Sequence, residues 1–191
     1  MTRDFVLVAH EAPTDADFSL DNLPGAGRLD LLCRCINAAL LTSHGVRENT
    51  TAHLVIRSGD RDVTVRFEGA RVQGLNPDER SIAGVVRAAL SERTYHEVEA
   101  SRGVYVAERS LAETVNTTDG ETVVLHENGE EGYDAPTEEP TFVVSDHRDF
   151  DDEDLSAVRD ARRISLGPVA LHADHATAVA HNRCDTRGWE R

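Results

Sequence analysis

Short apolar segments alternate with helical segments in the C-terminal half of the chain, and this alternation restricts the fold more than any other feature. Strands that alternate with helices are typical of a parallel sheet, because each helix carries the chain back to the start of the next strand. We predict an α/β fold with a mostly parallel sheet. Because no linker interrupts the 191 residues, we predict one domain, 1–191. The predicted strands are 5–9, 122–126, 141–145 and 162–166, and the predicted helices are 151–160 and 174–183.

The N-terminal half adds two helices and a hairpin. Apolar residues at helical spacing predict a helix over 28–41, after a loop of about 18 residues. A second helix is expected with Asn76 as N-cap, Pro77 in the first helical position and Glu79 completing a capping box. Further predictions are a hairpin of strands 53–57 and 62–67, a strand at 104–106, a short helix at 110–115 and an acidic loop over 127–140.

The charge of the chain bears on its partners. Thirty-five acidic residues against twenty basic ones give a net charge of −15, and every basic residue is Arg. Such a charge opposes nucleic-acid binding in dilute salt. In molar intracellular salt the Debye length falls to roughly 3 Å, and the carboxylates then serve solubility. A halophilic source explains both the acid excess and the missing Lys, whereas an acidic partner-binding protein explains only the charge.

Targeting segments and disulfides are not indicated by the sequence. No apolar run approaches the roughly 20 residues of a membrane span, and the N-terminal run resembles a strand more than a signal peptide. Three cysteines do not form an even disulfide set, and Cys33 and Cys35 point to different faces of a helix. We therefore expect a reduced, cytoplasmic protein with no membrane partner.

Small and polar residues follow three predicted strands, at 125–129, 145–147 and 164–168. Ligands of open α/β sheets bind outside the carboxyl ends of the strands. Three such loops could hold a nucleoside through backbone contacts, but ordinary polar turns explain the same residues. Both interpretations stay open at this point.

Histidines and nucleophiles give weaker signals. His172 and His175 lie three residues apart, but no Cys or carboxylate pattern completes a tetrahedral site, so capping and packing are favoured and no metal is predicted. Ser145, Asp146 and His147 are adjacent and cannot converge as a triad. The sequence contains no P-loop and no recognisable hydrolase nucleophile.

Two predicted helix starts combine Arg with carboxylates. Arg28, Asp30 and Arg34 lie at the first, and Asp78 and Arg80 at the second. Arg can bind phosphate bidentately or stack on a base, and helix N-termini favour anions. A capped, solvated helix start is the alternative for each.

Five motifs in one order carry a resemblance to a known family. They occupy 23–35, 76–80, 125–129, 146–147 and 164–175. From about residue 3 to residue 183 the chain resembles the archaeal tRNA pseudouridine-54 N1-methyltransferases of the SPOUT superfamily. The resemblance implies a C-terminal trefoil knot, a rare exception to unknotted topology, with S-adenosyl-L-methionine bound at the knot. It also implies a homodimer and a tRNA substrate.

The resemblance also assigns site residues. Two positions depart from the family pattern, because Ser145 stands where relatives carry Gly and Ala176 where they often carry Cys. The implied cofactor-binding residues are Leu125, Asn128, Gly129, Ser145, Ser165, Leu166, Gly167, Leu171 and Ala176.

The implied reaction is methyl transfer to N1 of pseudouridine 54 in the tRNA T-loop. N1 carries a proton, so a carboxylate or an ordered water must accept it. Asp30 and Asp78 are candidate bases, and the candidate RNA contacts are Arg28, Arg34 and Arg80. The alternatives are N1-methylation of a ribosomal-RNA pseudouridine and a non-catalytic α/β module that binds RNA or protein.

The interpretation of the charge predicts that folding depends on salt. Circular dichroism should show native secondary structure in molar KCl and its loss in dilute buffer, because unscreened carboxylates repel one another. A stable fold in dilute buffer would contradict the halophilic interpretation.

Overall fold

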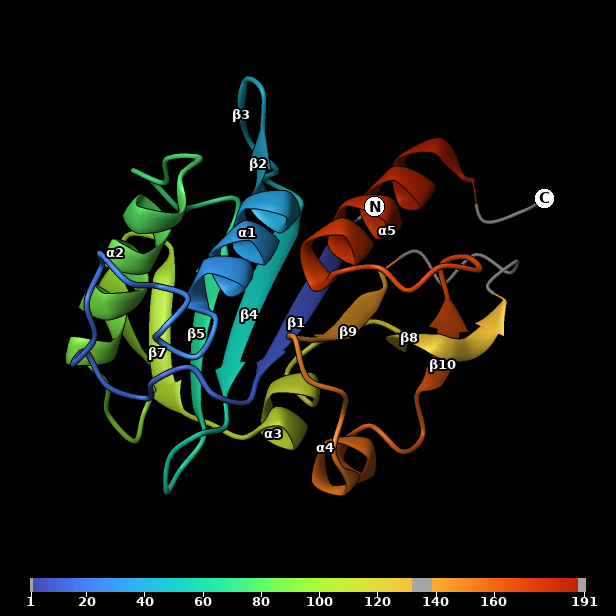
Figure 1. Ribbon diagram of the computed structural model, residues 1–191. Coiled ribbons are helices and arrows are strands. Elements are labelled where there is room, and N and C mark those ends of the chain that lie inside the picture. Colours follow the sequence, from blue (N-terminus) through green and yellow to red (C-terminus); the bar gives the residue numbers. More distant parts are fainter. Residues whose placement is uncertain (1, 132–138, 189–191) are drawn as a thin grey trace.

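An eight-stranded sheet forms the centre of the computed structural model, which describes residues 2–131 and 139–188 (Figure 1). Its strand order is β10-β8-β9-β1-β4-β5-β7-β6. The strands are β1 (Arg3–Ala9), β4 (Thr50–Ile56), β5 (Val63–Glu68), β6 (Val98–Ser101), β7 (Val104–Glu108), β8 (Thr122–Glu131), β9 (Thr141–Ser145) and β10 (Arg162–Ser165). The helices are α1 (Leu29–Leu40), α2 (Glu79–Ser91), α3 (Leu111–Val115), α4 (Asp152–Ala157) and α5 (Ala173–Thr186).

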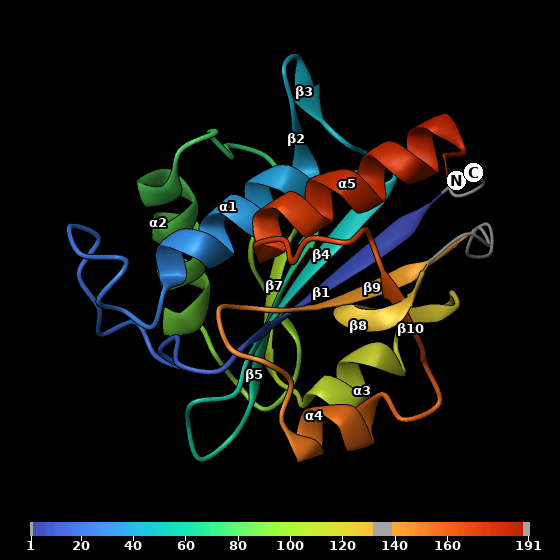
Figure 2. The same ribbon diagram turned by 45° about the vertical axis from the view of Figure 1, so that its right-hand side comes forward.

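The central strand β1 is buried on both faces. Phe5 and Leu7 belong to the hydrophobic core on one face, and Val6 and Val8 to the core on the other. Helices α1, α2 and α5 cover the first face, and α3 and α4 the second (Figures 1 and 2). A strand covered on both sides has no polar face, which is why its sequence is a continuous apolar run.

The sheet is parallel in the half that contains β10, β8, β9, β1 and β4, as predicted from the alternating segments. β4 and β5 form the predicted antiparallel hairpin, and β7 and β6 extend it. The edge strand β6 was not predicted, because its four residues alternate half-buried and exposed and include no long apolar run. A small hairpin of β2 (Leu41–Thr42) and β3 (Gly45–Val46) projects from the body (Figure 1).

The start of α2 differs from the prediction. Asp78, not Asn76, is the N-cap, and its Oδ1 accepts a hydrogen bond of 2.7 Å from the Ser81 backbone N–H. A carboxylate at this position both accepts that bond and interacts favourably with the helix dipole. Pro77 therefore precedes the cap, and the capping box predicted with Glu79 does not form.

The acidic loop predicted over 127–140 is wrong in its first part. β8 continues to Glu131, and residues 132–138 lie outside the described residues. Along β8, Val124 pairs with Arg163 and Glu130 with Ile164, so residues 125–129 are looped out between two consecutive pairs. Polarity suggested a loop, whereas the strand resumes because β10 offers backbone partners beyond the bulge.

Among the described residues, no helix is long and apolar enough to cross a membrane.

The long connection between β1 and α1 folds back onto its own beginning at Gly27. Gly27 has φ +60°, and a Cβ there would lie 1.9 Å from the carbonyl oxygen of Glu11. This contact brings the start of α1 next to the end of β1.

Replacing Gly27 with Ala should lower the free energy of unfolding by about 1–3 kcal/mol, because the left-handed backbone and the clash both oppose a side chain. Gly84→Ala is the matched control. Gly84 lies inside α2 with no atom within 4 Å of its Cβ position, so that change should stabilise by about 0.5–1 kcal/mol. Denaturant unfolding of both variants measures the difference, and equal effects would contradict the packing described for Gly27.

Candidate functional site

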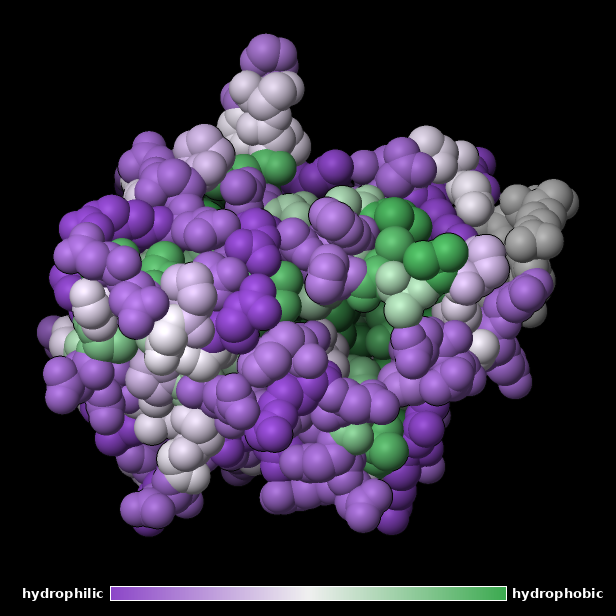
Figure 3. Space-filling view, viewed as in Figure 1, coloured by the Kyte–Doolittle hydropathy of each residue, from purple (hydrophilic) through white to green (hydrophobic). Residues whose placement is uncertain are grey.

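A pocket of about 320 Å³ opens at the looped-out part of β8, beside the ends of β9 and β10 and the beginning of α5. Figure 3 shows a hollow lined by hydrophobic side chains on the face where β9 and the start of α5 lie in Figure 1. The pocket lies at the carboxyl ends of parallel strands, the position where open α/β sheets bind ligands. Its apolar lining includes Leu125, Val144, Phe150, Leu166, Leu171 and Ala176.

Six of the nine predicted cofactor residues line this pocket. They are Leu125, Ser145, Ser165, Leu166, Leu171 and Ala176.

The other three predicted cofactor residues, Asn128, Gly129 and Gly167, are not among the lining residues. Asn128 and Gly129 belong to the looped-out part of β8, where a Cβ on Gly129 would lie 2.5 Å from the Ile164 carbonyl carbon. Gly129 therefore allows the close approach of β10 to β8. Gly167 accepts a hydrogen bond of 2.8 Å from the Ser165 hydroxyl.

Hydrogen bonds of their own side chains connect the loops around the pocket. The Ser145 hydroxyl donates to the Arg148 carbonyl at 2.6 Å, so this side chain forms a hydrogen bond within its own loop. His126 Nε2 lies 2.9 Å from Asp149 Oδ1 and connects the β8 bulge to the loop after β9. Arg183 donates from α5 to the Leu166 carbonyl at 2.5 Å.

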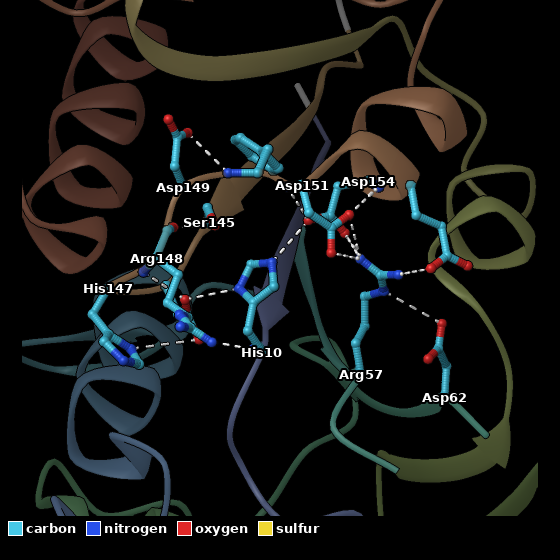
Figure 4. A network of polar contacts seen from close by, with 12 residues as sticks. His10, Arg57, Asp62, Ser145, His147, Arg148, Asp149, Asp151 and Asp154 are labelled. Atoms are coloured by element: carbon cyan, nitrogen blue, oxygen red, sulfur yellow. Dashed lines mark hydrogen bonds and ion pairs between the residues drawn. The ribbon is translucent and has the colours of Figure 1, made fainter. Parts of the chain in front are cut away.

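His10, the residue after β1, lies beside the pocket between two buried carboxylates (Figure 4). Its Nδ1 is 2.9 Å from Asp146 Oδ1, and its Nε2 is 2.8 Å from Asp154 Oδ2. The hydrogen bonds that the His10 ring donates to Asp146 and Asp154 raise the pKa of His10 to about 9, against a smaller opposing effect of burial. Burial raises the pKa of Asp146, but hydrogen bonds from His10 and from the Arg148 backbone together outweigh it, and the pKa is lowered overall.

Arg57 follows β4 and completes this cluster (Figure 4). It pairs with the buried carboxylate of Asp154 and lies 3.2 Å from Asp151, the N-cap of α4. Atoms of His10, Asp151 and Asp154 lie within 4.8 Å of one another, which is a spacing suited to a metal ion. Here these atoms are already bonded to Arg57 and to each other, so the cluster is an ion-pair network that joins β1, β4 and α4.

Sequence reasoning missed His10, Arg57 and Asp154. The rule that ligands and polar side chains gather after parallel strands was applied to the C-terminal strands only. Applied to β1 and β4 as well, it would have singled out the first two. Asp154 could not be found this way, because it comes from the first turn of α4.

The predicted residues at the start of α1 do come together. Asp30 is 6% exposed and accepts hydrogen bonds from Arg28 at 3.1 and 3.2 Å and from Arg34 at 3.1 Å. Burial raises the pKa of Asp30, but the hydrogen bonds from Arg28 and Arg34 outweigh it and the pKa is lowered. The carboxyl therefore stays ionised at neutral pH.

Arg34 also connects α1 to two other helices. Its guanidinium lies 2.8 Å from Glu79 on α2 and 3.1 Å from Asp174 on α5. At the start of α2, Arg80 pairs with the exposed Asp21. The two predicted Arg-and-carboxylate groups thus lie at adjoining helix starts, outside the lining of the pocket.

Glu11 joins the helix starts to the pocket rim. Gly27 packs on its backbone, while its carboxylate lies 3.2 Å from His147 and 3.0 Å from Arg148, both of which line the pocket. The start of α1 therefore borders the mouth of the pocket.

Comparison with known proteins defines the class. A family described as "Putative SAM-dependent RNA methyltransferase" matches residues 2–189. The crystal structure of Archaeoglobus fulgidus Nep1 bound to S-adenosylhomocysteine has the same fold, with a TM-score of 0.70 at 12% identity over 97% of this chain and 98% of that one. The class is that of S-adenosylmethionine-dependent RNA methyltransferases.

Two curated relatives narrow the class further. A Natronomonas pharaonis protein is 49% identical over 99% of both chains, and a Halobacterium salinarum protein is 45% identical over 98% of both. Each is named tRNA (pseudouridine(54)-N(1))-methyltransferase. The chain belongs to this family, in agreement with the resemblance found in its motifs.

Proposed function

We propose that this protein transfers a methyl group from S-adenosylmethionine to N1 of pseudouridine 54 in tRNA. The observation that carries the proposal is the pocket at the looped-out part of β8 and the ends of β9 and β10, which collects residues from three of the family-like motifs in one place. Near full-length relatives that are named for this reaction support the same substrate.

The pocket residues suit the proposed cofactor. Leu125, Leu166 and Leu171 offer apolar surface to a planar base. Glu127 and Asp149 are also lining residues, and their negative charge favours a positively charged ligand. Val169 is 70% exposed and Leu171 40% exposed, so a bound nucleoside would cover apolar side chains that otherwise face water. When bound, S-adenosylmethionine supplies a sulfonium methyl group that a nitrogen nucleophile can attack.

The protein would contribute position and proton transfer. Holding the two reactants in line can supply about 7–11 kcal/mol of the barrier. Asp30 is an ionised carboxylate at the border of the pocket, and Asp78 stands at the neighbouring helix start. We propose these two as candidates to accept the N1 proton, with Arg28, Arg34 and Arg80 holding the RNA.

Further parts of the proposal concern the whole molecule. We propose one domain over residues 1–191 with a C-terminal trefoil knot, supported by β10, which pairs with the edge of β8 opposite β9 before α5 returns to pack on α1. We also propose a homodimer, from the family resemblance, and a halophilic source, from the charge of −15. The cytoplasmic location is proposed from the cysteine content and the strand-like N-terminal run.

Purified protein with labelled S-adenosylmethionine should methylate tRNA that carries pseudouridine 54 and leave uridine-54 tRNA unmodified, because uridine has no free N1–H. Mass spectrometry of the nucleosides identifies the product. Transfer only to a ribosomal-RNA fragment would support the ribosomal alternative, and absence of transfer with intact RNA binding would support a non-catalytic module.

In the same assay, Asp30→Asn or Asp78→Asn should slow methyl transfer by about 10²–10⁴-fold if the residue is the base, because an amide cannot accept the proton. Full activity with normal tRNA affinity would remove that residue from the candidates.

Filling the pocket should weaken cofactor binding without unfolding the protein. Ala176 lines the pocket and is 8% exposed, and Ala176→Leu should weaken S-adenosylmethionine binding by at least about tenfold in calorimetry. Ala178→Leu, on the exposed side of the same helix, should bind as the wild type does. Equal affinities for the two variants would show that the cofactor binds elsewhere.

A further inference from the structure

Both ring nitrogens of His10 face carboxylates, and this geometry fixes its protonation. Nδ1 lies 2.9 Å from Asp146, and Nε2 lies 2.8 Å from Asp154. An ionised carboxylate only accepts hydrogen bonds, whereas a neutral imidazole has one N–H to donate. Only the imidazolium form donates to both partners at once.

Several hydrogen bonds of Asp146 hold the loop that follows β9 in place. Its Oδ2 accepts from the His10 backbone N–H at 2.8 Å, and its Oδ1 accepts from the Arg148 backbone N–H at 2.9 Å. Its own N–H donates to the Val8 carbonyl at 3.0 Å. The side chain has no exposed surface.

The same loop forms one wall of the pocket. Six consecutive residues, 145–150, line it, and Asp146 is the second of them. A change in the hydrogen bonds of Asp146 therefore changes the shape of the wall directly.

We propose that His10 is a positioning residue for the cofactor pocket, which in its charged form clamps Asp146 to Asp154 and so holds the loop 145–150 in its binding shape. This inference rests on the proposed function, since it concerns the affinity of the same pocket for S-adenosylmethionine. It assigns no contact between His10 and the cofactor, because His10 is not among the lining residues.

The charged groups around His10 favour the protonated form of its ring. Asp146 faces His10 from the loop after β9, and Asp154 faces it from α4. Arg57, at the end of β4, already pairs with Asp154 and Asp151. Glu11, which follows His10 in the chain, pairs with His147 and Arg148. Without the charge on His10, Asp146 would retain two backbone N–H donors and the more distant ring of His147, whose Nδ1 lies 3.6 Å from Asp146 Oδ2. Arg57 would not replace His10, because it is bonded to the α4 carboxylates.

The pH range of the effect follows from the direction of the shift. The pKa of His10 is raised to about 9, so the imidazolium persists through neutral pH and is lost as the pH rises through that value. Affinity for the cofactor should therefore be constant from pH 6.5 to about pH 8 and fall above it.

The test compares wild type with His10→Gln, which carries no charge and has both of its side-chain N–H donors on one nitrogen, whereas the His10 ring donates from two separate nitrogens. At pH 7 the variant should bind S-adenosylmethionine about tenfold more weakly or worse, the effect of one lost charged hydrogen bond. The fall in cofactor affinity above pH 8 should also be absent from the variant. The ligand's own amino group titrates equally with both proteins, so its effect cancels when the wild-type affinity is divided by that of the variant. His96→Gln, an exposed histidine in a distant loop, is the matched control and should behave as wild type.

A second measurement does not depend on the variant folding. The side-chain ¹⁵N shifts of His10 in the wild type should report a doubly protonated ring at pH 7, with circular dichroism confirming the fold at each pH. A neutral ring at pH 7, or a His10→Gln variant with unchanged affinity and pH profile, would overturn the inference while leaving the proposed function intact. A wild type that binds no S-adenosylmethionine would overturn both.

Discussion

The parallel pairing of β1 with β9 on one side and β4 on the other is the constraint on which the site depends. Parallel strands in register end at the same edge, so His10, Asp146 and Arg57, which follow β1, β9 and β4, meet there although they are up to 136 positions apart in the chain. A shift of β1 by one residue against its neighbouring strands would move Phe5 and Leu7 into the core that holds Val6 and Val8, and the reverse. The packing of both cores therefore opposes such a shift. The apolar packing of β1 thereby places the polar cluster.

The acid-rich composition acquires a structural meaning in this fold. Arg28 and Arg34 both bond to the buried Asp30, and Arg57 to the buried Asp154. Arg34 joins α1 to α2 and α5, and Arg57 joins β4 to α4. Their forked guanidinium groups can hold several carboxylates at once, which a lysine ammonium does less well. Contact with RNA at the helix starts would therefore use arginines already held in place by carboxylates, in a protein whose overall charge does not attract phosphate.

Much of the fold could be predicted from local patterns. The apolar run at 5–9 marked the central strand, the stripe of α1 marked its helix, and the hairpin of β4 and β5 followed from their alternating residues. One prediction failed where a partner far along the chain decides the local structure, and another where two nearby residues could each serve as the helix cap. β8 resumes after its bulge because β10 pairs with it, and α2 starts at Asp78 because that carboxylate, two residues after the expected cap, takes the capping bond.

The sequence by itself determined the class of fold, the family and most of the residues around the pocket, because these are written in short motifs and in the periodicity of apolar residues. Only the tertiary structure decided that His10, Asp146 and Asp154 form one cluster beside the pocket, and that Gly129 serves the packing of β10 on β8. The reason is physical. Hydrogen bonds and close backbone contacts depend on distances of a few ångströms between segments far apart in sequence, and no local pattern encodes those distances.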